Sequence, residues 1–440
     1  MNKTYLEQYE MKKCLPRQAI SMINNDDIVF TGGDPDALLD ALYEDRERFN
    51  GLKIYSTFGI SRKLGEKIHS AEMTDHIQFT ATVLKQTEER AWMRGNVDQV
   101  LVSFSEMEDL IERRYRPTVL LTHCAPMDED GYFSMHTQAG CGSGRSAVNC
   151  GAKVLVQVNN TLPSVHTDYY RIHISEVTAL CEMNSPSAKL DPDDKEPSEI
   201  DKSIAAHIVD HIPNGATIQL GAGAVPSILG RFLEHHKDLG VHTELFVETM
   251  THLMKKGVIN NSKKTLLPGI SVAGFLGGGS ETRAFADKNP AVMIKKLAWV
   301  NDPAVISQID NMISINSCLG VDLRGQVCAE SIGLNNTGGL GGQLDFVRGV
   351  RKSKGGKSFI VMRSIVEKKD GTKLSKITLT LPAGSVVSTP RSDVMYVVTE
   401  YGFADLYYKS AKERAKALIA IAHPDFREEL LFEAKKYGYI

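Results

Sequence analysis

Short, nearly continuous apolar runs recur along the chain and predict its strands. A strand covered on both faces of a parallel sheet has such a run instead of a strict alternation of apolar and polar residues. The clearest runs are residues 99–104, 118–122, 152–158, 216–220, 357–362 and 393–399. These runs favour an α/β fold with mostly parallel sheets.

One longer segment has the spacing of an amphipathic helix. Apolar side chains recur every three or four positions in residues 409–422, which places them on one side of a helix. They are Ala411, Ala415, Leu418, Ile419 and Ala422. Pro424 follows them and predicts the end of the helix, because proline cannot continue the helical hydrogen-bond pattern.

The same order of elements occurs twice along the chain. Residues 22–39 and residues 211–228 each have the pattern of a helix end, a turn, a strand, a glycine turn and a new helix. A repeated opening unit predicts two similar domains in tandem. The expected fold is therefore two tandem open α/β domains of similar topology with mostly parallel sheets.

Composition suggests where the two domains separate. Residues 184–199 are rich in proline and acidic side chains and contain few large apolar residues, which is typical of a linker. We expect an N-terminal domain over residues 1–183, a linker over residues 184–200 and a C-terminal domain over residues 201–440.

The bulk composition is ordinary for a soluble protein, with 42% hydrophobic and 24% charged residues. A net charge of −3 gives no reason to expect nucleic acid or an anionic membrane as a partner. The seven cysteines include no C-x-x-C pair, which favours reduced thiols over disulfides or a metal site. Neither a signal peptide nor a membrane-spanning run is recognisable, so we expect a cytoplasmic protein.

A glycine turn and one acidic residue form the candidate reactive site. The turn at residues 221–226, Gly-Ala-Gly-Ala-Val-Pro, follows the apolar run 216–220 and precedes a segment with helical spacing. Backbone N–H groups in such a turn suit a phosphate or a developing oxyanion. Glu244 follows within the segment 240–246 and is the candidate reactive carboxylate. The alternative is an ordinary solvated glutamate beside a strand.

Several further motifs occur in an order that resembles the acetyl-CoA hydrolase/transferase family of CoA-transferases. That group includes 4-hydroxybutyrate CoA-transferase and butyryl-CoA:acetate CoA-transferase. The resemblance extends over nearly the whole chain and is strongest in its second half. The matching segments are residues 128–134, 219–226, 242–246, 315–327, 338–346, 398–406 and 421–427.

The resemblance implies roles for particular residues. Glu244 matches the nucleophilic glutamate of the family. The positions that contact CoA match Gly221, Ala222, Gly223, Ala224, Val225, Leu319, Gly341, Gly342 and Lys369. An acyl-CoA and a small carboxylic acid are the implied substrates, with CoA entering as a thioester substrate and no permanently bound cofactor. A homo-oligomer is also expected.

A glutamate can carry out this reaction without a separate base. An exposed glutamate has a pKa of roughly 4.3, so Glu244 is expected to be an anion at neutral pH and able to attack a carbonyl. Attack on an acyl-CoA leads through a mixed anhydride to a glutamyl-CoA thioester. Backbone N–H groups of residues 221–225 are the expected oxyanion donors. If water reached the thioester, the same residue would make the protein an acyl-CoA hydrolase, which is the alternative activity.

Three other classes of protein share single features with this sequence. A dinucleotide-binding dehydrogenase fits Gly221 and Gly223 after a strand, but Pro226 stands where the third glycine of that motif belongs. A serine hydrolase is disfavoured because Ser143 lacks the G-x-S-x-G elbow. A non-enzymatic CoA-binding protein would be supported if Glu244→Ala changed no activity.

The acceptor acid is left open by the sequence. Residues 246–249 stand where relatives usually have a Ser-Asp-Gly-like segment, and residues 30–35 and 139–145 look unlike the acetate- and butyrate-using members. Acetate, butyrate, 4-hydroxybutyrate and a short dicarboxylate such as itaconate are therefore all open. A dicarboxylate would need a cationic partner, for which Arg94 or Arg145 is the hypothesis. For the CoA phosphates, the candidate cations are Arg348, Arg351, Lys352 and Lys354.

Overall fold

The computed structural model describes residues 3–135, 143–184, 198–221 and 223–440. The predicted linker therefore lies mostly outside the described residues, as does most of the segment 139–145. Two compact units are present: residues 1–190, 273–299 and 337–341 form the first, and residues 191–272, 300–336 and 342–440 form the second. The domain limits of 1–183 and 201–440 stay a prediction.

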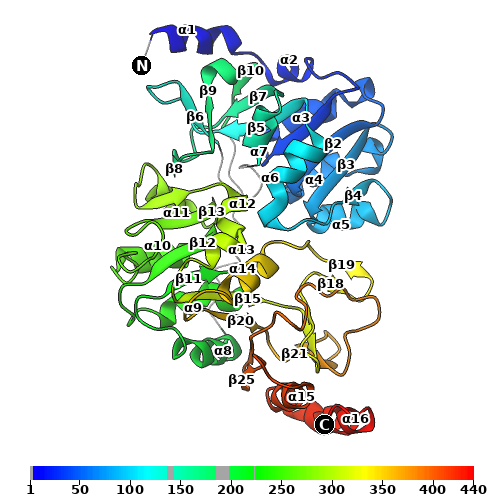
Figure 1. Ribbon diagram of the computed structural model, residues 1–440. Helices are drawn as coiled ribbons and strands as arrows, with labels where there is room; N and C mark the ends of the chain where they lie inside the picture. The colour runs from blue at the N-terminus through cyan, green and yellow to red at the C-terminus, as the bar shows by residue number, and fades with distance from the viewer. Residues whose placement is uncertain (1–2, 136–142, 185–197, 222) are drawn as a thin grey trace. The chain divides into compact units, whose positions relative to one another are not determined.

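The first unit is built on a seven-stranded sheet in the order β10-β7-β5-β1-β2-β3-β4, in which every pair is parallel (Figure 1). The strands are β1 (Ile28–Gly32), β2 (Leu52–Phe58), β3 (Ile77–Val83), β4 (Val97–Gln99), β5 (Val119–Cys124), β7 (Lys153–Val158) and β10 (Ala179–Glu182). Strand β5 is buried at all six positions. Its continuous apolar run is thus explained by cover on both faces.

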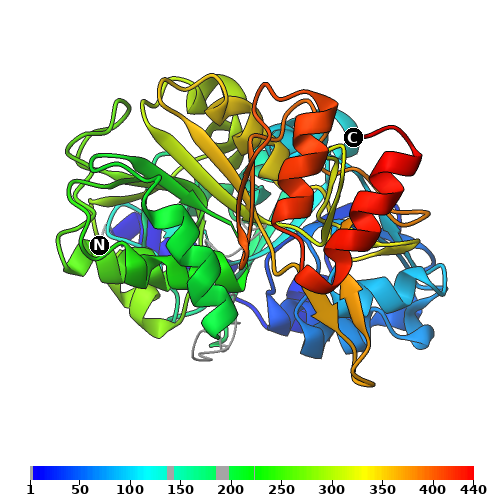
Figure 2. The ribbon, with the colours of Figure 1, turned by 90° about the horizontal axis from the view of Figure 1, so that it is seen from below.

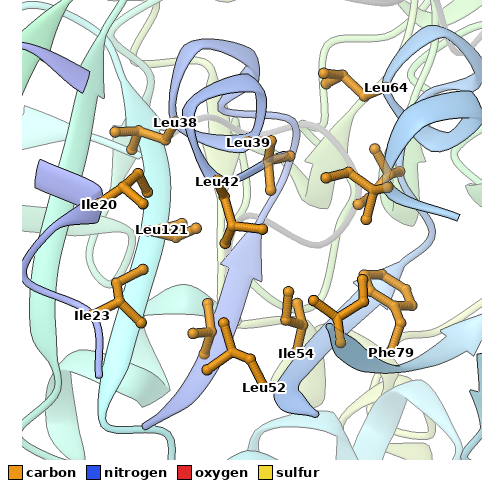
Figure 3. Close-up of a cluster of buried hydrophobic side chains, with 14 of the residues drawn as sticks. Ile20, Ile23, Leu38, Leu39, Leu42, Leu52, Ile54, Leu64, Phe79 and Leu121 are labelled. Carbon is orange, nitrogen blue, oxygen red and sulfur yellow. The ribbon is translucent and has the colours of Figure 1, made fainter. Parts of the chain in front are cut away.

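The following helices belong to the first unit; one of them, Asp36–Glu44, buries its apolar side against this sheet, whereas Lys3–Lys12 has no buried residue. They are α1 (Lys3–Lys12), α2 (Pro16–Ile20), α3 (Asp36–Glu44), α4 (Arg62–Ile68), α5 (Gln86–Trp92), α6 (Met107–Asp109), α7 (Gly144–Asn149) and α11 (Ser280–Ala286). Figure 3 shows Leu38, Leu39 and Leu42 of α3 packed over Leu52 and Ile54 of β2. All five side chains are fully buried.

Shorter elements complete the first unit. Strand β6 (Tyr132–Ser134) pairs antiparallel with β9 (Arg171–His173), and β8 (His166–Thr167) pairs parallel with β14 (Val292–Ile294). Single helical turns are η1 (Arg46–Arg48), η2 (Ala71–Met73), η3 (Phe104–Glu106), η4 (Leu110–Tyr115) and η5 (Ile174–Glu176). Helix α12 (Leu297–Asn301) begins in this part of the chain.

The second unit has strands in the order β25-β24-β20-β15-β11-β12, and β13 begins in this unit. Their bounds are β11 (Thr217–Leu220), β12 (Gly240–Phe246), β13 (Ser271–Leu276), β15 (Met312–Ser317), β20 (Lys357–Val361), β24 (Tyr396–Thr399) and β25 (Gly402–Asp405). Strands β11, β12, β15, β20 and β24 run parallel, and β25 returns antiparallel to β24. In the first unit β1 lies between β2 and β5, and in the second unit β11 lies between β12 and β15. The same arrangement around the first strand of each sheet confirms the predicted repetition.

The helices of the second unit are α8 (Glu199–Val209), α9 (Ala224–Phe232), α10 (Glu248–Lys255), α13 (Pro303–Ile306), α14 (Gln343–Val350), α15 (Ala411–Ala420) and α16 (Pro424–Lys436). Small strands are β16 (Gly320–Asp322), β17 (Val327–Cys328), β18 (Ser331–Ile332), β19 (Asn335–Asn336), β21 (Ile365–Glu367), β22 (Lys373–Ser375) and β23 (Ile377–Thr378). Pro424 does follow the predicted helix, and it also starts α16, because proline suits the first helical position.

The α/β fold class is confirmed, and five of the six apolar runs contain a strand. The run 99–104 is the exception: β4 ends at Gln99, and Leu101 is 69% exposed. This strand is at the edge of its sheet, so the apolar residues that follow it are not enclosed between two neighbours. Among the helices of the described residues, none combines the length and apolar character needed to span a bilayer.

Candidate active site

Glu244 lies at the carboxyl end of β12, in the second unit. Strand β11 runs parallel to β12, with Thr217 opposite Gly240 and Ile218 opposite Val241. Continued along the two strands, this register brings Gly221 opposite Glu244, because each lies four residues beyond Thr217 and Gly240. The glycine turn and the acidic residue are therefore neighbours because two adjacent parallel strands end at the same edge of the sheet.

Two hydrogen-bond donors hold the Glu244 carboxylate. The Asn301 side chain donates from Nδ2 to Glu244 Oε1 over 2.8 Å. A backbone hydrogen bond comes from Gly342. The same Asn301 nitrogen lies 3.5 Å from Oδ2 of Asp345, so one amide bridges two carboxyl groups. Asn301 is fully buried, which fixes the position of its amide.

The surroundings of Glu244 change its acidity. Burial raises the pKa of Glu244, the bonds from Asn301 and Gly342 lower it, and the negative charge of Asp345 raises it; together they bring this pKa to about 7. The expectation of an ordinary, fully ionised glutamate is therefore wrong. At neutral pH the protonated and ionised forms coexist, so small changes in these neighbours alter how much nucleophile is present.

Gly342 needs to be glycine for a steric reason. A Cβ atom on this residue would overlap both Asn301 Nδ2 and Glu244 Oε1. Gly342 is also the residue before the first turn of α14. The free N–H groups at the start of a helix carry partial positive charge, so this position favours the ionised carboxylate.

The turn after β11 is equally crowded. A Cβ on Gly221 would overlap Asn316 Oδ1, and a Cβ on Gly223 would overlap Ser317 Oγ. Gly223 has a φ of 136°, a conformation that side-chain-bearing residues rarely adopt. Both glycines therefore let the turn pass closely over the end of β15, where Asn316 exchanges two amide hydrogen bonds with Gln219.

Not every predicted oxyanion donor is free. The Gly221 N–H donates to the carbonyl of Ile315 at 2.8 Å, so it belongs to the sheet and not to a ligand site. Ala222 lies outside the described residues. Ala224 and Val225 open α9, where first-turn N–H groups have no partner within the helix. Pro226 in the same turn has no N–H, which leaves Ala224 and Val225 as the better candidates.

Three other predicted positions lie on separate segments of the chain, and their contact with CoA stays a prediction. Leu319 is half-buried between β15 and β16, where its N–H donates to the carbonyl of Cys328. Lys369 is exposed in the turn between β21 and β22. Gly341 belongs to the first unit, where its carbonyl accepts from the N–H of Phe104.

Sequence reasoning missed Asn301 and Asp345. Asp345 lies in the segment 338–346, and its place in the first turn of α14 could have suggested a role beside Gly342. Asn301 ends the short helix α12 and belongs to no motif or periodic pattern. Its contact with Glu244 spans 57 positions of the chain, which no local signal can indicate.

The structure also accounts for several cations named from the sequence. Arg145 makes two hydrogen bonds, of 2.8 and 3.0 Å, to the carboxylate of Glu176, so its charge is already paired. Arg94 is exposed and donates to the carbonyl of His69. Arg348 and Arg351 share the carboxylate of Asp393, at 3.1 and 2.9 Å.

Comparison with known proteins identifies the chain's relatives. Residues 1–213 match the acetyl-CoA hydrolase/transferase N-terminal domain, and residues 278–434 match the corresponding C-terminal domain. The chain is 38% identical to a 4-hydroxybutyrate coenzyme A transferase of Clostridium kluyveri, over 98% of this chain and 99% of that protein. It is 36% identical to a succinyl-CoA:cyclohexane-1-carboxylate CoA transferase of Geobacter metallireducens, over 100% and 98%. The structure of RipA from Yersinia pestis has a TM-score of 0.93 and 33% identity, and the match covers 99% of this chain and 100% of RipA.

Proposed function

Because this chain belongs to the acetyl-CoA hydrolase/transferase family, we propose that it transfers CoA from an acyl-CoA to a small carboxylic acid, with Glu244 as the nucleophile. The observation that carries the proposal is the environment of this carboxylate. It stands beside a glycine turn at the end of two parallel strands and receives hydrogen bonds from Asn301 and Gly342. A surface glutamate would have neither feature.

The reaction proceeds in two halves. Ionised Glu244 attacks the acyl-CoA carbonyl, and the thiolate of CoA leaves as a mixed anhydride forms. The thiolate then attacks the glutamyl carbonyl, which releases the donor's carboxylic acid and leaves a glutamyl-CoA thioester. The acceptor carboxylate attacks this thioester and forms a second anhydride. The thiolate finally attacks the acceptor's acyl carbonyl, which yields the new acyl-CoA and free Glu244.

The raised pKa of Glu244 suits this sequence. A carboxylate with a pKa of about 7 is more basic than an exposed one, and it is still ionised in about half of the molecules at pH 7. Asn301 and Gly342 hold it in one orientation before attack. The first-turn N–H groups of Ala224 and Val225 are the proposed oxyanion donors, and loss of one such donor costs about 3–4 kcal/mol of transition-state stabilisation.

The proposed acceptor is a short monocarboxylate. Relatives are named for the acids 4-hydroxybutyrate and cyclohexane-1-carboxylate, each with one carboxylate, although the second relative is also named for succinyl-CoA, whose acyl group carries a further carboxylate. Arg145, a hypothetical partner for a second carboxylate, is already paired with Glu176. Arg94, the other candidate, is exposed and donates to the carbonyl of His69, so a dicarboxylate such as itaconate stays open as an acceptor.

Trapping of the intermediate tests the proposal. The protein is incubated with acetyl-CoA, treated with borohydride or left untreated, digested, and weighed by mass spectrometry. We expect the untreated peptide that contains Glu244 to gain the mass of CoA and the borohydride-treated peptide to carry a reduced side chain. Glu244→Gln should show neither change and no turnover. Normal turnover by Glu244→Gln, or turnover of the wild type with an unmodified peptide, would refute the assignment.

Hydrolysis by the same residue is the second candidate activity, since the family includes hydrolases. Release of free CoA with no acceptor present measures it directly. A rate that matches the rate of transfer would make hydrolysis the main activity. The expected homo-oligomer and cytoplasmic location stay predictions, and light scattering of the purified chain tests the first.

A further inference from the structure

A cavity of about 570 Å³ lies in the second unit. It is bordered by the turn after β16, by the segment before β24, by the start of α15 and by the end of α16. Four of its lining residues are cationic: Arg324, Arg391, Lys409 and Arg414. No step of the proposed transfer reaction uses them.

The positive charge in this cavity is not balanced by carboxylates. Arg414 is half-buried, and its guanidinium donates to three backbone carbonyls, those of Arg391 at 2.6 Å, Lys409 at 3.3 Å and Arg324 at 3.5 Å. Among the described residues, no carboxylate forms an ion pair with Arg324, Arg391 or Arg414. Carbonyl oxygens orient the Arg414 side chain but leave its full charge, so the cavity keeps a positive potential.

Three acidic residues of this region have other partners or only a weak pairing. Glu413 accepts from the N–H of Ser410 at the start of α15, and the charge of Lys409 also acts on it. Asp405 is 3.9 Å from the Lys409 ammonium, at the limit of an ion pair. Asp393 is already shared by two arginines outside the cavity. Burial lowers the pKa of Arg414, and the charges of Arg351 and Arg391 lower it further. Neighbouring cations repel one another, and a bound anion would remove this repulsion.

Two tyrosines complete the lining and suggest how large the ligand is. The Arg324 guanidinium lies 4.7 Å from the centre of the Tyr439 ring, and Tyr437 also borders the cavity. An arginine stacked on an aromatic ring presents a flat surface as well as a charge. The cavity volume is within the range of small-molecule sites, which is roughly 300–1,000 Å³.

The cavity is remote from Glu244. Asp405, four residues before Lys409, pairs with Tyr396 at the amino end of β24, whereas Glu244 is at the carboxyl end of β12. The two strands are separated by β20, β15 and β11. Four strand spacings of about 4.8 Å give roughly 19 Å across the sheet. The distance along the strands, from their amino ends to their carboxyl ends, adds to this separation.

Lys369, the lysine expected to contact CoA, is also distant. Its hairpin is tied to the start of α16 by the ion pair between Lys373 and Asp425. Tyr437 follows the other end of that helix, which is the red helix beside the C-terminus in Figure 2. A helix of 13 residues is about 20 Å long. The cavity is therefore separate from both the glutamate and the lysine of the expected CoA site.

We propose that this cavity is a binding site for a phosphorylated small molecule, with the phosphate held by Arg324, Arg391, Lys409 and Arg414 and the remainder lying against the tyrosines. Phosphate oxygens match the fork of an arginine and accept from lysine. The phosphate groups of CoA share this chemistry, so the test must separate them from a second ligand. The site stands independently of the role proposed for Glu244.

Calorimetric titration of the full chain with inorganic pyrophosphate and with ADP tests the site. We expect both to bind, and binding to weaken about tenfold or more in the double variant Arg324→Gln/Arg391→Gln. Both side chains are exposed, so the variant should fold. Lys416→Gln removes an exposed cation from α15 outside the cavity and should leave the dissociation constant within about twofold of the wild-type value. Equal binding by the double variant and the wild type, or no binding by the wild type, would overturn the proposal.

Competition identifies the source of the phosphate. Pyrophosphate is titrated again in the presence of saturating desulfo-CoA, which lacks the reactive thiol. An unchanged pyrophosphate affinity supports a second ligand, and the double variant should then keep the wild-type KM for acyl-CoA. Displacement by desulfo-CoA, together with a raised KM, would assign the cavity to CoA itself and overturn the proposal of a separate site.

Discussion

Asn301→Ala removes the side chain that donates to Glu244 Oε1 over 2.8 Å. A hydrogen bond to a charged group contributes about 1.5–3 kcal/mol. Each 1.36 kcal/mol corresponds to about one pKa unit, so the pKa of Glu244 should rise by roughly one to two units above its value near 7. The ionised fraction at pH 7 then falls from about half to roughly 1–10%.

The expected result is a loss that depends on pH. The kcat/KM of Asn301→Ala at pH 7 should be roughly 5- to 50-fold below the wild-type value, and most of it should return by about pH 9.5, because the remaining carboxylate ionises there. The assay is transfer from acetyl-CoA to 4-hydroxybutyrate between about pH 5.5 and 9.5, with the new thioester quantified by mass.

Asn260→Ala is the matched control. Asn260 is an exposed asparagine of the same unit whose amide donates to Asp238, away from Glu244. Its pH profile should coincide with that of the wild type. If Asn301→Ala lowered kcat/KM equally at every pH, Asn301 would act by placing the carboxylate and not through its ionisation, and the electrostatic reasoning would be refuted.

Four further outcomes follow from the same geometry. In the wild type, kcat/KM should rise with pH through about 7 and then level off, because Glu244 must lose its proton to attack and burial has raised its pKa to about 7; a flat profile between pH 6 and 8 would contradict this. Asp345→Asn removes a like charge, so the midpoint of the profile should move to lower pH. Gly342→Ala should abolish most turnover through overlap with Glu244 and Asn301, with a loss of stability of about 1–3 kcal/mol seen in thermal melting. Leu42→Ala, in the core of the first unit, should cost about 2–5 kcal/mol in urea unfolding.

The fold could be predicted from the sequence because strands that are buried on both faces consist mainly of apolar residues. Strands β5, β7 and β20 are covered on both faces, and their residues are correspondingly apolar with few interruptions. The repeated order of strand, glycine turn and helix was also recognisable in both halves, because it is a local pattern of the sequence. Edges are harder to predict: at β4 the apolar run continues beyond the strand, and only the position of β4 in the sheet decides where pairing stops.

The candidate site could be predicted only where it is local. The turn from Gly221 and the position of Glu244 depend on two consecutive strands, so their proximity follows from a parallel sheet. Asn301 reaches Glu244 from a distant helix, and its contribution is visible only in three dimensions. The same is true of the acidity of Glu244, since burial and the charge of Asp345 are properties of the folded chain.

The neighbours of Glu244 act in opposite directions, and this opposition bears on a reaction in which the residue has two tasks. As a nucleophile the carboxylate benefits from basicity, which burial and Asp345 provide. It must also be ionised when substrate arrives, and later it must leave from an anhydride, both of which favour a lower pKa. Asn301 and Gly342 lower the pKa of Glu244 by donating hydrogen bonds to its ionised form. A pKa close to 7 keeps either task from being suppressed at neutral pH, and strengthening one set of neighbours alone would slow the step that depends on the other.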